Sequence, residues 1–239
     1  MIEVYMLQLD ERKAAALYPV LLNYVSAERR EAAGRYRKPI DAYRSLTGEI
    51  LARLAVRQQL RIPNDELVFV KNAYGKPMLS PPAADCHFNV SHAGSWVVCA
   101  FGDSPVGVDV ERIKPIDISI AERFFAPEEY AALTSLPEQE QLRFFYQLWT
   151  LKESYIKAVG KGLSIPLDSF SFTIAADGKV SVDVKGADVP EVYVQQLFAD
   201  DFHPMAVCAF NETMPVFREL SMEELEGMLP LLDQVLLLP

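Results

Sequence analysis

The sequence predicts an α+β fold with two similar subdomains in pseudo-twofold arrangement, each a small, mainly antiparallel sheet packed on a long helix. Residues 41–60 and 138–159 have apolar side chains at helical spacing, and short strand patterns follow each of them. In addition, residues 98–101 and 207–210 share the sequence Val-Cys-Ala-Phe. A chance match of two apolar strands would explain four residues nearly as well, so the repeat alone leaves duplication open.

The first half, expected at residues 1–104, alternates strands and helices. Ser26 is a suitable N-cap for a helix, and Pro63 ends the long helix. The linker between the last two strands is short enough for a hairpin. In order, we expect a strand at 2–9, helices from 27 and over 41–60, a strand at 67–71, a turn at 74–77, and strands at 87–90 and 96–101 joined by the linker 92–95.

The second half, expected at residues 105–215, repeats this plan, and a helical tail is expected at 216–239. Pro127 suits the first position of a helix, Ser221 begins a capping box, and Pro230 should interrupt the helix that follows. In order, we expect a strand at 106–112, helices at 119–125, from 127 and over 138–159, and strands at 170–174, 180–184, 192–198 and 205–210.

Composition limits the function classes. The 239 residues carry a formal net charge of -10, which argues against binding to nucleic acid, where affinity comes from neutralising phosphates. Three cysteines without CxxC spacing suggest neither a disulfide framework nor a zinc site, and Cys99 and Cys208 should be buried thiols. Neither a signal peptide nor a membrane span is evident, so a cytoplasmic protein without membrane partners is expected.

Acidic residues provide the strongest chemical signal. Asp109 and Glu111 alternate with valines on one strand, so both carboxylates point to the same side. They could be a solvated pair at an edge, or they could bind a hard divalent cation. Trp149, Glu153 and Lys157 form one ridge of the long helix. The ridge could bring a third carboxylate and an ammonium to the strand, or it could hold only a surface ion pair.

Two other segments suggest a phosphate. Ser91 and His92 lie at a predicted hairpin corner, where a hydroxyl and an imidazole can bind a phosphate oxygen, and no convincing Ser-His-Asp spacing accompanies them. The basic residues between 29 and 38 could be a solvated helix face or an arginine site for a phosphate.

Taken together, these motifs resemble the 4′-phosphopantetheinyl transferase superfamily. Its signature pair is similar to GVDVE at 107–111 followed by WTLKES at 149–154 with Lys157. YGKP at 74–77 and FNVSH at 88–92 resemble two further motifs of the Sfp-type branch, in the same order. The likeness covers about residues 2–210, and the enzymes that activate peptide synthetases look most similar.

This resemblance implies an enzyme with coenzyme A bound between the halves. It would transfer the 4′-phosphopantetheine group to a serine of an apo peptidyl or acyl carrier domain and release adenosine 3′,5′-bisphosphate. Asp109, Glu111 and Glu153 would hold Mg²⁺ or Mn²⁺. Glu153, or a metal-bound water beside it, would accept the serine proton. The implied catalytic residues are Glu153, Asp109, Lys157 and His92; the implied coenzyme A contacts are Arg29, Arg35, Arg44, Ser45, Lys76, Pro77, Ser91, His92, Asp109 and Lys157.

The chain departs from the family at its basic helix, where Ala32 and Gly34 stand at places that a basic residue would be expected to occupy. The carrier is expected to dock on apolar residues, with Ile118, Phe124 and Phe125 as candidates, and the internal duplication favours a monomer. Two other functions remain open: a metal-dependent phosphoanhydride hydrolase that acts on coenzyme A or a nucleotide, and a non-catalytic module that binds carrier domains.

Overall fold

The computed structural model describes residues 1–82, 85–184, 192–210 and 214–234 and has an α+β fold, as predicted. Its helices are α1 (Glu11–Leu21), α2 (Ala27–Ala33), α3 (Pro39–Leu60), α4 (Ala121–Phe124), α5 (Pro127–Ser135), α6 (Glu138–Val159) and α7 (Met222–Asp233). Its strands are β1 (Ile2–Gln8), β2 (Val68–Lys71), β3 (Pro77–Ser80), β4 (His87–Ala93), β5 (Trp96–Gly102), β6 (Val106–Val110), β7 (Phe170–Ile174), β8 (Val180–Val184), β9 (Tyr193–Asp200), β10 (His203–Ala209) and β11 (Val216–Leu220).

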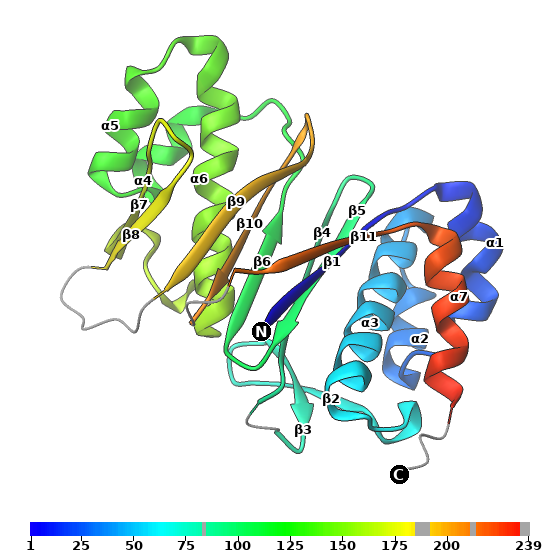
Figure 1. Cartoon of the computed structure of the whole chain (residues 1–239). Coiled ribbons are helices and arrows are strands. Elements are labelled where there is room, and N and C mark those ends of the chain that lie inside the picture. The colour runs from blue at the N-terminus through cyan, green and yellow to red at the C-terminus, as the bar shows by residue number, and fades with distance from the viewer. Residues whose placement is uncertain (83–84, 185–191, 211–213, 235–239) are drawn as a thin grey trace.

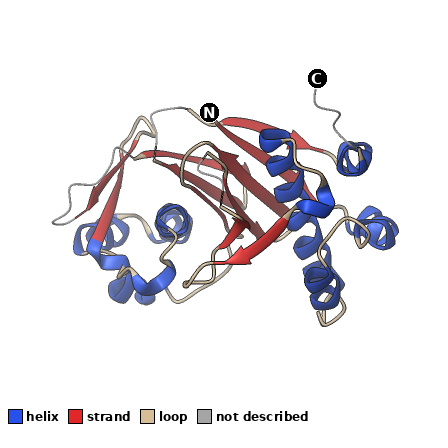
Figure 2. Ribbon diagram, turned by 90° about the horizontal axis from the view of Figure 1, so that it is seen from below, coloured by secondary structure: helices blue, strands red, loops and turns tan. Residues whose placement is uncertain are grey.

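Two sheets lie inside the molecule with helices on their outer faces (Figures 1 and 2). One sheet has the strand order β11-β1-β5-β4 and the other the order β6-β10-β9. The neighbours pair antiparallel except β1 and β11, which run parallel. β2–β3 and β7–β8 form two separate hairpins. Each main sheet therefore has a long helix of its own, α3 for the first and α6 for the second.

The repeated Val-Cys-Ala-Phe segments occupy matching places in the two halves. The first lies on β5, the second begins on β10, and each of these strands is central in its sheet. Cys99 and Cys208 point to the helix-covered faces, while Val98 and Val207 belong to one apolar core shared by both sheets. Alternation along each strand thus divides its side chains between the core of its own half and the core shared by both sheets. Both thiols are buried, as predicted.

The sequence predicted several bounds correctly and missed others. The bounds of α6 and β7 agree with the prediction, and Ser26 and Ser221 cap their helices. β4 extends through Ala93, so the expected linker at 92–95 is wrong and the turn is only Gly94–Ser95. The sequence analysis did not predict α1 or β3, and the tail expected to be helical from residue 216 begins instead with the strand β11.

The expected interruption at Pro230 is also wrong, because α7 continues to Asp233. Leu225, Leu229 and Leu232 are buried on one face of α7 against the core of the first half, and this packing outweighs the proline. β11 pairs with β1, so residues 216–233 join the first half in space. The subdomain boundaries at 104 and 215 stay predictions.

Candidate active site

β4 and β6 run side by side where the two halves meet, and side chains of β4 link them. Asn89 Oδ1 accepts a hydrogen bond of 2.9 Å from the Val108 amide, and Ser91 Oγ accepts one of 3.4 Å from the Val110 amide. These side chains take the place of a backbone ladder between the two edge strands. We call this contact between β4 and β6 the seam. It fixes Ser91 beside Asp109.

Gly107 lets β6 lie directly against α6. A Cβ atom built on Gly107 would lie 2.0 Å from the Ser154 carbonyl oxygen and 2.4 Å from the Ala158 nitrogen. Both neighbours are helix backbone atoms, which cannot swing aside as a flexible side chain can. Glycine at this position therefore brings Asp109, two residues further along the strand, within reach of Lys157.

Asp109 is a buried carboxylate, and its two oxygens differ in their hydrogen-bond partners. Its Oδ1 accepts hydrogen bonds from Lys157 Nζ at 2.5 Å and from the Ser91 hydroxyl at 2.9 Å. Its buried Oδ2 has no hydrogen-bond partner among the described residues. Burial raises the pKa of Asp109, and Lys157 and Ser91 act against that rise. A buried oxygen without a donor is suited to a cation.

Glu111 and Glu153 lie near enough to interact with Asp109 electrostatically. Burial raises the pKa of Glu111 to about 7, and the charges of Asp109 and Glu153 add to the rise. The pKa of Glu153 is raised by burial and then by Asp109. Like charges that raise one another's pKa favour the binding of a cation between them. Even so, within the described ranges no three Asp, Glu, His or Cys side chains form a complete group of metal ligands.

Lys157 of α6 forms hydrogen bonds with both β4 and β6. Its ammonium lies 2.5 Å from Asp109 Oδ1, 3.1 Å from Ser91 Oγ and 3.3 Å from the Val108 carbonyl oxygen. The sequence left open a surface ion pair between Glu153 and Lys157. Among the ion pairs of the described residues, that of Lys157 is with Asp109. The ridge of α6 therefore meets the acidic strand as the helical spacing suggested.

His92 lies near the C-terminal end of β4, and Arg44 of α3 contacts the turn that follows this strand. Partial enclosure of the imidazole lowers the pKa of His92, and the charges of Arg44 and Lys157 lower it further. The Arg44 guanidinium donates to the Gly94 carbonyl oxygen through Nε at 2.7 Å and also through a second nitrogen, and it donates to Asp41 at 2.7 Å. His92 therefore lies within a positive field, beside a turn that Arg44 holds.

Of the implied coenzyme A contacts in this region, Arg29 and Ser45 lie together, and Arg35 lies apart from them. Arg29 donates to Ser45 Oγ at 2.9 Å and to the buried carboxylate of Glu49 at 2.8 Å. Arg35 instead makes an exposed ion pair with Glu31 on the outside of α2. Arg29 and Ser45 could thus meet one ligand, whereas Arg35 would have to leave Glu31 to join them.

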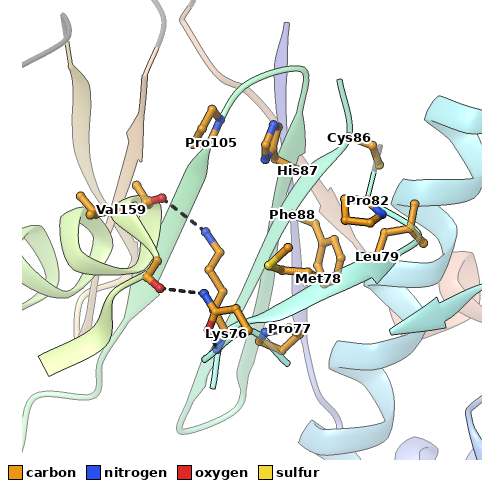
Figure 3. Close-up of a pocket in the computed structure, with 13 residues that line it drawn as sticks. Lys76, Pro77, Met78, Leu79, Pro82, Cys86, His87, Phe88, Pro105 and Val159 are labelled. Carbon is orange, nitrogen blue, oxygen red and sulfur yellow. Dashed lines mark hydrogen bonds between the residues drawn. The ribbon is translucent and has the colours of Figure 1, made fainter. Parts of the chain in front are cut away.

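Lys76 and Pro77 line a pocket of about 230 Å³ between the β3 region and the C-terminal end of α6 (Figure 3). The Lys76 ammonium donates to the backbone carbonyls of Lys157 at 2.6 Å and Val106 at 3.1 Å. Burial lowers its pKa to about 8. In this structure the ammonium thus holds the end of α6, and its contact with coenzyme A stays a prediction.

One candidate for carrier docking was wrong. Phe125 is only 2% exposed and stacks on Phe145 in the second core, so its ring is not available to a partner. Phe124 and Ile118 are partly exposed and pack at the edge of the same core. The prediction therefore remains only for these two residues.

Gly107 and Asn89 are positioned at the site, yet the sequence analysis assigned them no role. A glycine within a run of valines on a strand could have signalled a close approach of two backbones. Asn89, in an otherwise apolar strand, could have signalled a side chain that bonds a neighbouring strand. Both signals are visible in the sequence, but neither identifies its partner.

Two family models match the two parts of the chain. The family model described as "4'-phosphopantetheinyl transferase superfamily" matches residues 105–208, and that described as "4'-phosphopantetheinyl transferase, N-terminal" matches residues 13–103. A holo-(acyl-carrier-protein) synthase from Bacillus anthracis shares a partial structural likeness, with a TM-score of 0.39 and 18% identity over 44% of this chain and 94% of that chain.

Relatives match over most of the chain. The 4′-phosphopantetheinyl transferase Sfp of Bacillus subtilis is 39% identical over 213 residues, which are 89% of this chain and 94% of the relative. The transferase psf-1 of Bacillus pumilus is 42% identical over 200 residues, 84% of this chain and 85% of the relative. The chain therefore belongs to the 4′-phosphopantetheinyl transferase superfamily.

Proposed function

We propose that the protein transfers the 4′-phosphopantetheine group of coenzyme A to a serine of an apo carrier protein domain and releases adenosine 3′,5′-bisphosphate. The observation that supports this most is the buried carboxylate of Asp109, with Lys157 and Ser91 on one oxygen and no partner among the described residues on the other. Membership of the family and the names of the relatives point the same way.

The transfer is a displacement at one phosphorus of the coenzyme A pyrophosphate. The carrier serine Oγ forms a bond to the phosphorus that bears pantetheine, and the bond from that phosphorus to the oxygen of the bisphosphate breaks. Glu153 would accept the serine proton, because it is the carboxylate that α6 presents close to Asp109. Lys157 donates to the pyrophosphate oxygens, where negative charge develops on the leaving group.

Asp109, Glu111 and Glu153 fit a divalent cation, Mg²⁺ or Mn²⁺, by their chemistry. All three offer carboxylate oxygens, and Asp109 Oδ2 is buried without a donor among the described residues. When bound, such a cation would neutralise phosphate charge and stabilise the leaving group. Because no complete ligand group is present among the described residues, Glu111 and Glu153 would have to reorient on binding.

His92, Ser91, Arg29 and Ser45 would meet the remaining phosphates of coenzyme A. Their donors come from β4, α2 and α3. Arg44 would act beside them by holding the turn after β4. Lys76, just before β3, and Pro77, the first residue of β3, would contact the adenosine end, and Arg35 would join once released from Glu31.

The finer identity of the partner also belongs to this proposal. We infer a peptidyl carrier of a peptide synthetase as the first candidate and an acyl carrier as the second, with the transferase acting as a cytoplasmic monomer in antibiotic biosynthesis. No helix in the described part of the chain is long and apolar enough to cross a membrane.

The test is the mass of an apo-carrier after incubation with coenzyme A and Mg²⁺. The wild type should add one phosphopantetheine to the carrier, and Asp109→Asn or Asp109→Ala should abolish the gain while leaving the circular dichroism spectrum unchanged. Asp183→Asn, an exposed acid on β8, is the matched control and should behave as wild type. Normal transfer by the Asp109 variants would refute the site. Equal cleavage of coenzyme A without carrier would favour the hydrolase alternative.

A further inference from the structure

The turn between β4 and β5 is held from both halves of the molecule. Gly94, in this turn, has a φ of +57°, and its carbonyl oxygen accepts two bonds from Arg44 of α3. On the other side lies the imidazole of His203, the first residue of β10. A Cβ atom on Gly94 would lie 2.2 Å from His203 Nε2, so the ring edge rests directly against the turn.

His203 is itself fixed by Asp200. Its Nδ1 lies 2.7 Å from Asp200 Oδ1, while Asp200 Oδ2 accepts a hydrogen bond of 2.8 Å from the indole nitrogen of Trp96. Trp96 pairs with Ala93 across the β4–β5 hairpin. The carboxylate of Asp200 therefore holds the imidazole and the hairpin together, and His203 is only 6% exposed.

The turn between β9 and β10, together with the start of β10, also holds the end of β6, the strand that carries the acids. The Pro204 carbonyl oxygen accepts a hydrogen bond of 3.0 Å from the Glu111 amide, and the Phe202 carbonyl oxygen accepts one of 2.9 Å from the Ile113 amide. Figure 1 shows the β9–β10 and β4–β5 turns at the same end of their sheets. One short segment thus contacts both the strand that carries the acids and the turn after His92.

We infer that His203 is a positioning residue, which sets the place of Ser91 and His92 relative to Asp109 and Glu111; this inference rests on the proposed function. Its Nε2 is buried without a hydrogen-bond partner among the described residues, so this edge acts by packing rather than by polar contact. Its Nδ1 bond to Asp200 fixes the plane of the ring. Without the ring, the turn after His92 loses its support from the second half.

The test separates coenzyme A binding from carrier binding. His203→Ala should raise both the Kd and the KM of coenzyme A about 10-fold, because the phosphate contacts of Ser91 and His92 are displaced. Calorimetry with Mg²⁺ measures the Kd. The KM for the carrier should stay within about 2-fold, because apolar docking does not use this turn. Phe202→Ala, an exposed side chain in the same turn, is the matched control and should match wild type.

A compensating pair tests the contact itself. Gly94→Ala should impair coenzyme A binding because its Cβ meets His203, and His203→Ala in the same chain should recover at least part of that loss. His203→Asn, which keeps a donor toward Asp200 but lacks the ring edge, is the second single variant should the alanine variant not fold. Unchanged coenzyme A affinity in the folded His203 variant, or a double variant as weak as the two losses combined, would overturn the inference. Absence of transfer by the wild type would instead overturn the proposed function.

Discussion

At the scale of single residues, the behaviour of Asp109 depends on Lys157. Burial opposes ionisation of the carboxyl group, and the ammonium at 2.5 Å favours it. In the free protein Lys157 therefore opposes the effect of burial on the pKa of Asp109, at the place where substrate phosphates are proposed to bind. The same ammonium is then available to the pyrophosphate once another cation compensates Asp109.

Lys157→Met should accordingly weaken coenzyme A binding. A hydrogen bond to a charged group is worth about 1.5–3 kcal/mol, so we expect the KM for coenzyme A to rise roughly 10- to 100-fold. Steady-state transfer kinetics would measure it. Lys161→Met, an exposed lysine just after α6, is the control. An unchanged KM in Lys157→Met would remove this residue from the site.

The buried thiols make a prediction that depends on pH. Burial raises the pKa of Cys86 to about 11 and also raises those of Cys99 and Cys208. At about pH 8, Cys86 should therefore have roughly 100-fold less thiolate than an ordinary cysteine. Alkylation by iodoacetamide, followed by mass spectrometry, should be slower in the native protein by at least this factor and should accelerate as the pH rises. Rapid labelling at neutral pH would show that Cys86 is accessible.

At the scale of elements, the contact between β6 and α6 positions the acids. Gly107→Ala should destabilise the protein by about 1–3 kcal/mol and abolish transfer, because the new methyl group meets helix backbone. Chemical denaturation and the carrier mass assay would measure the two effects. Gly227→Ala, on α7 with nothing near its Cβ position, should be neutral or stabilising within about 1 kcal/mol. Full activity in Gly107→Ala would disprove the close contact.

The sequence predicted the elements of the site better than their contacts. Periodicity located β6 and α6, since alternation and helical spacing are local properties of the chain. It could not show that Lys157 pairs with Asp109 rather than Glu153, that Lys76 bonds carbonyls, or that Phe125 is buried. Those outcomes depend on how α6, the loop before β3 and α4 meet in space. Similarly, the sequence analysis expected Pro230 to break α7. The leucine contacts that keep this helix intact are tertiary, so the local sequence does not show them.

At the scale of the whole molecule, the shared core makes the two halves one cooperative unit. Residues of β1, β5, β6 and β10 interlock between the sheets, with Ile2, Val98, Val108 and Val207 fully buried. Unfolding of one sheet would expose the inner face of the other. The position of the seam between β4 and β6 therefore depends on both halves.

Leu225→Ala tests this cooperativity from a distance. The residue is fully buried on α7, in the core of the first half, so its loss should cost about 2–5 kcal/mol. Hydrogen exchange should report an equal loss of protection for α3 and for α6, although α6 belongs to the other half. Glu226→Ala, the exposed neighbour, should change neither helix. A loss confined to α3 would mean that the halves unfold separately.

The most direct measurement of the central claim is a crystal structure of the protein with coenzyme A and Mn²⁺, in which anomalous scattering locates the ion. We predict one peak within about 2.5 Å of carboxylate oxygens of Asp109, Glu111 and Glu153 and of the pyrophosphate. A peak elsewhere, or one that contacts Asp109 but neither Glu111 nor Glu153, would contradict the proposed site.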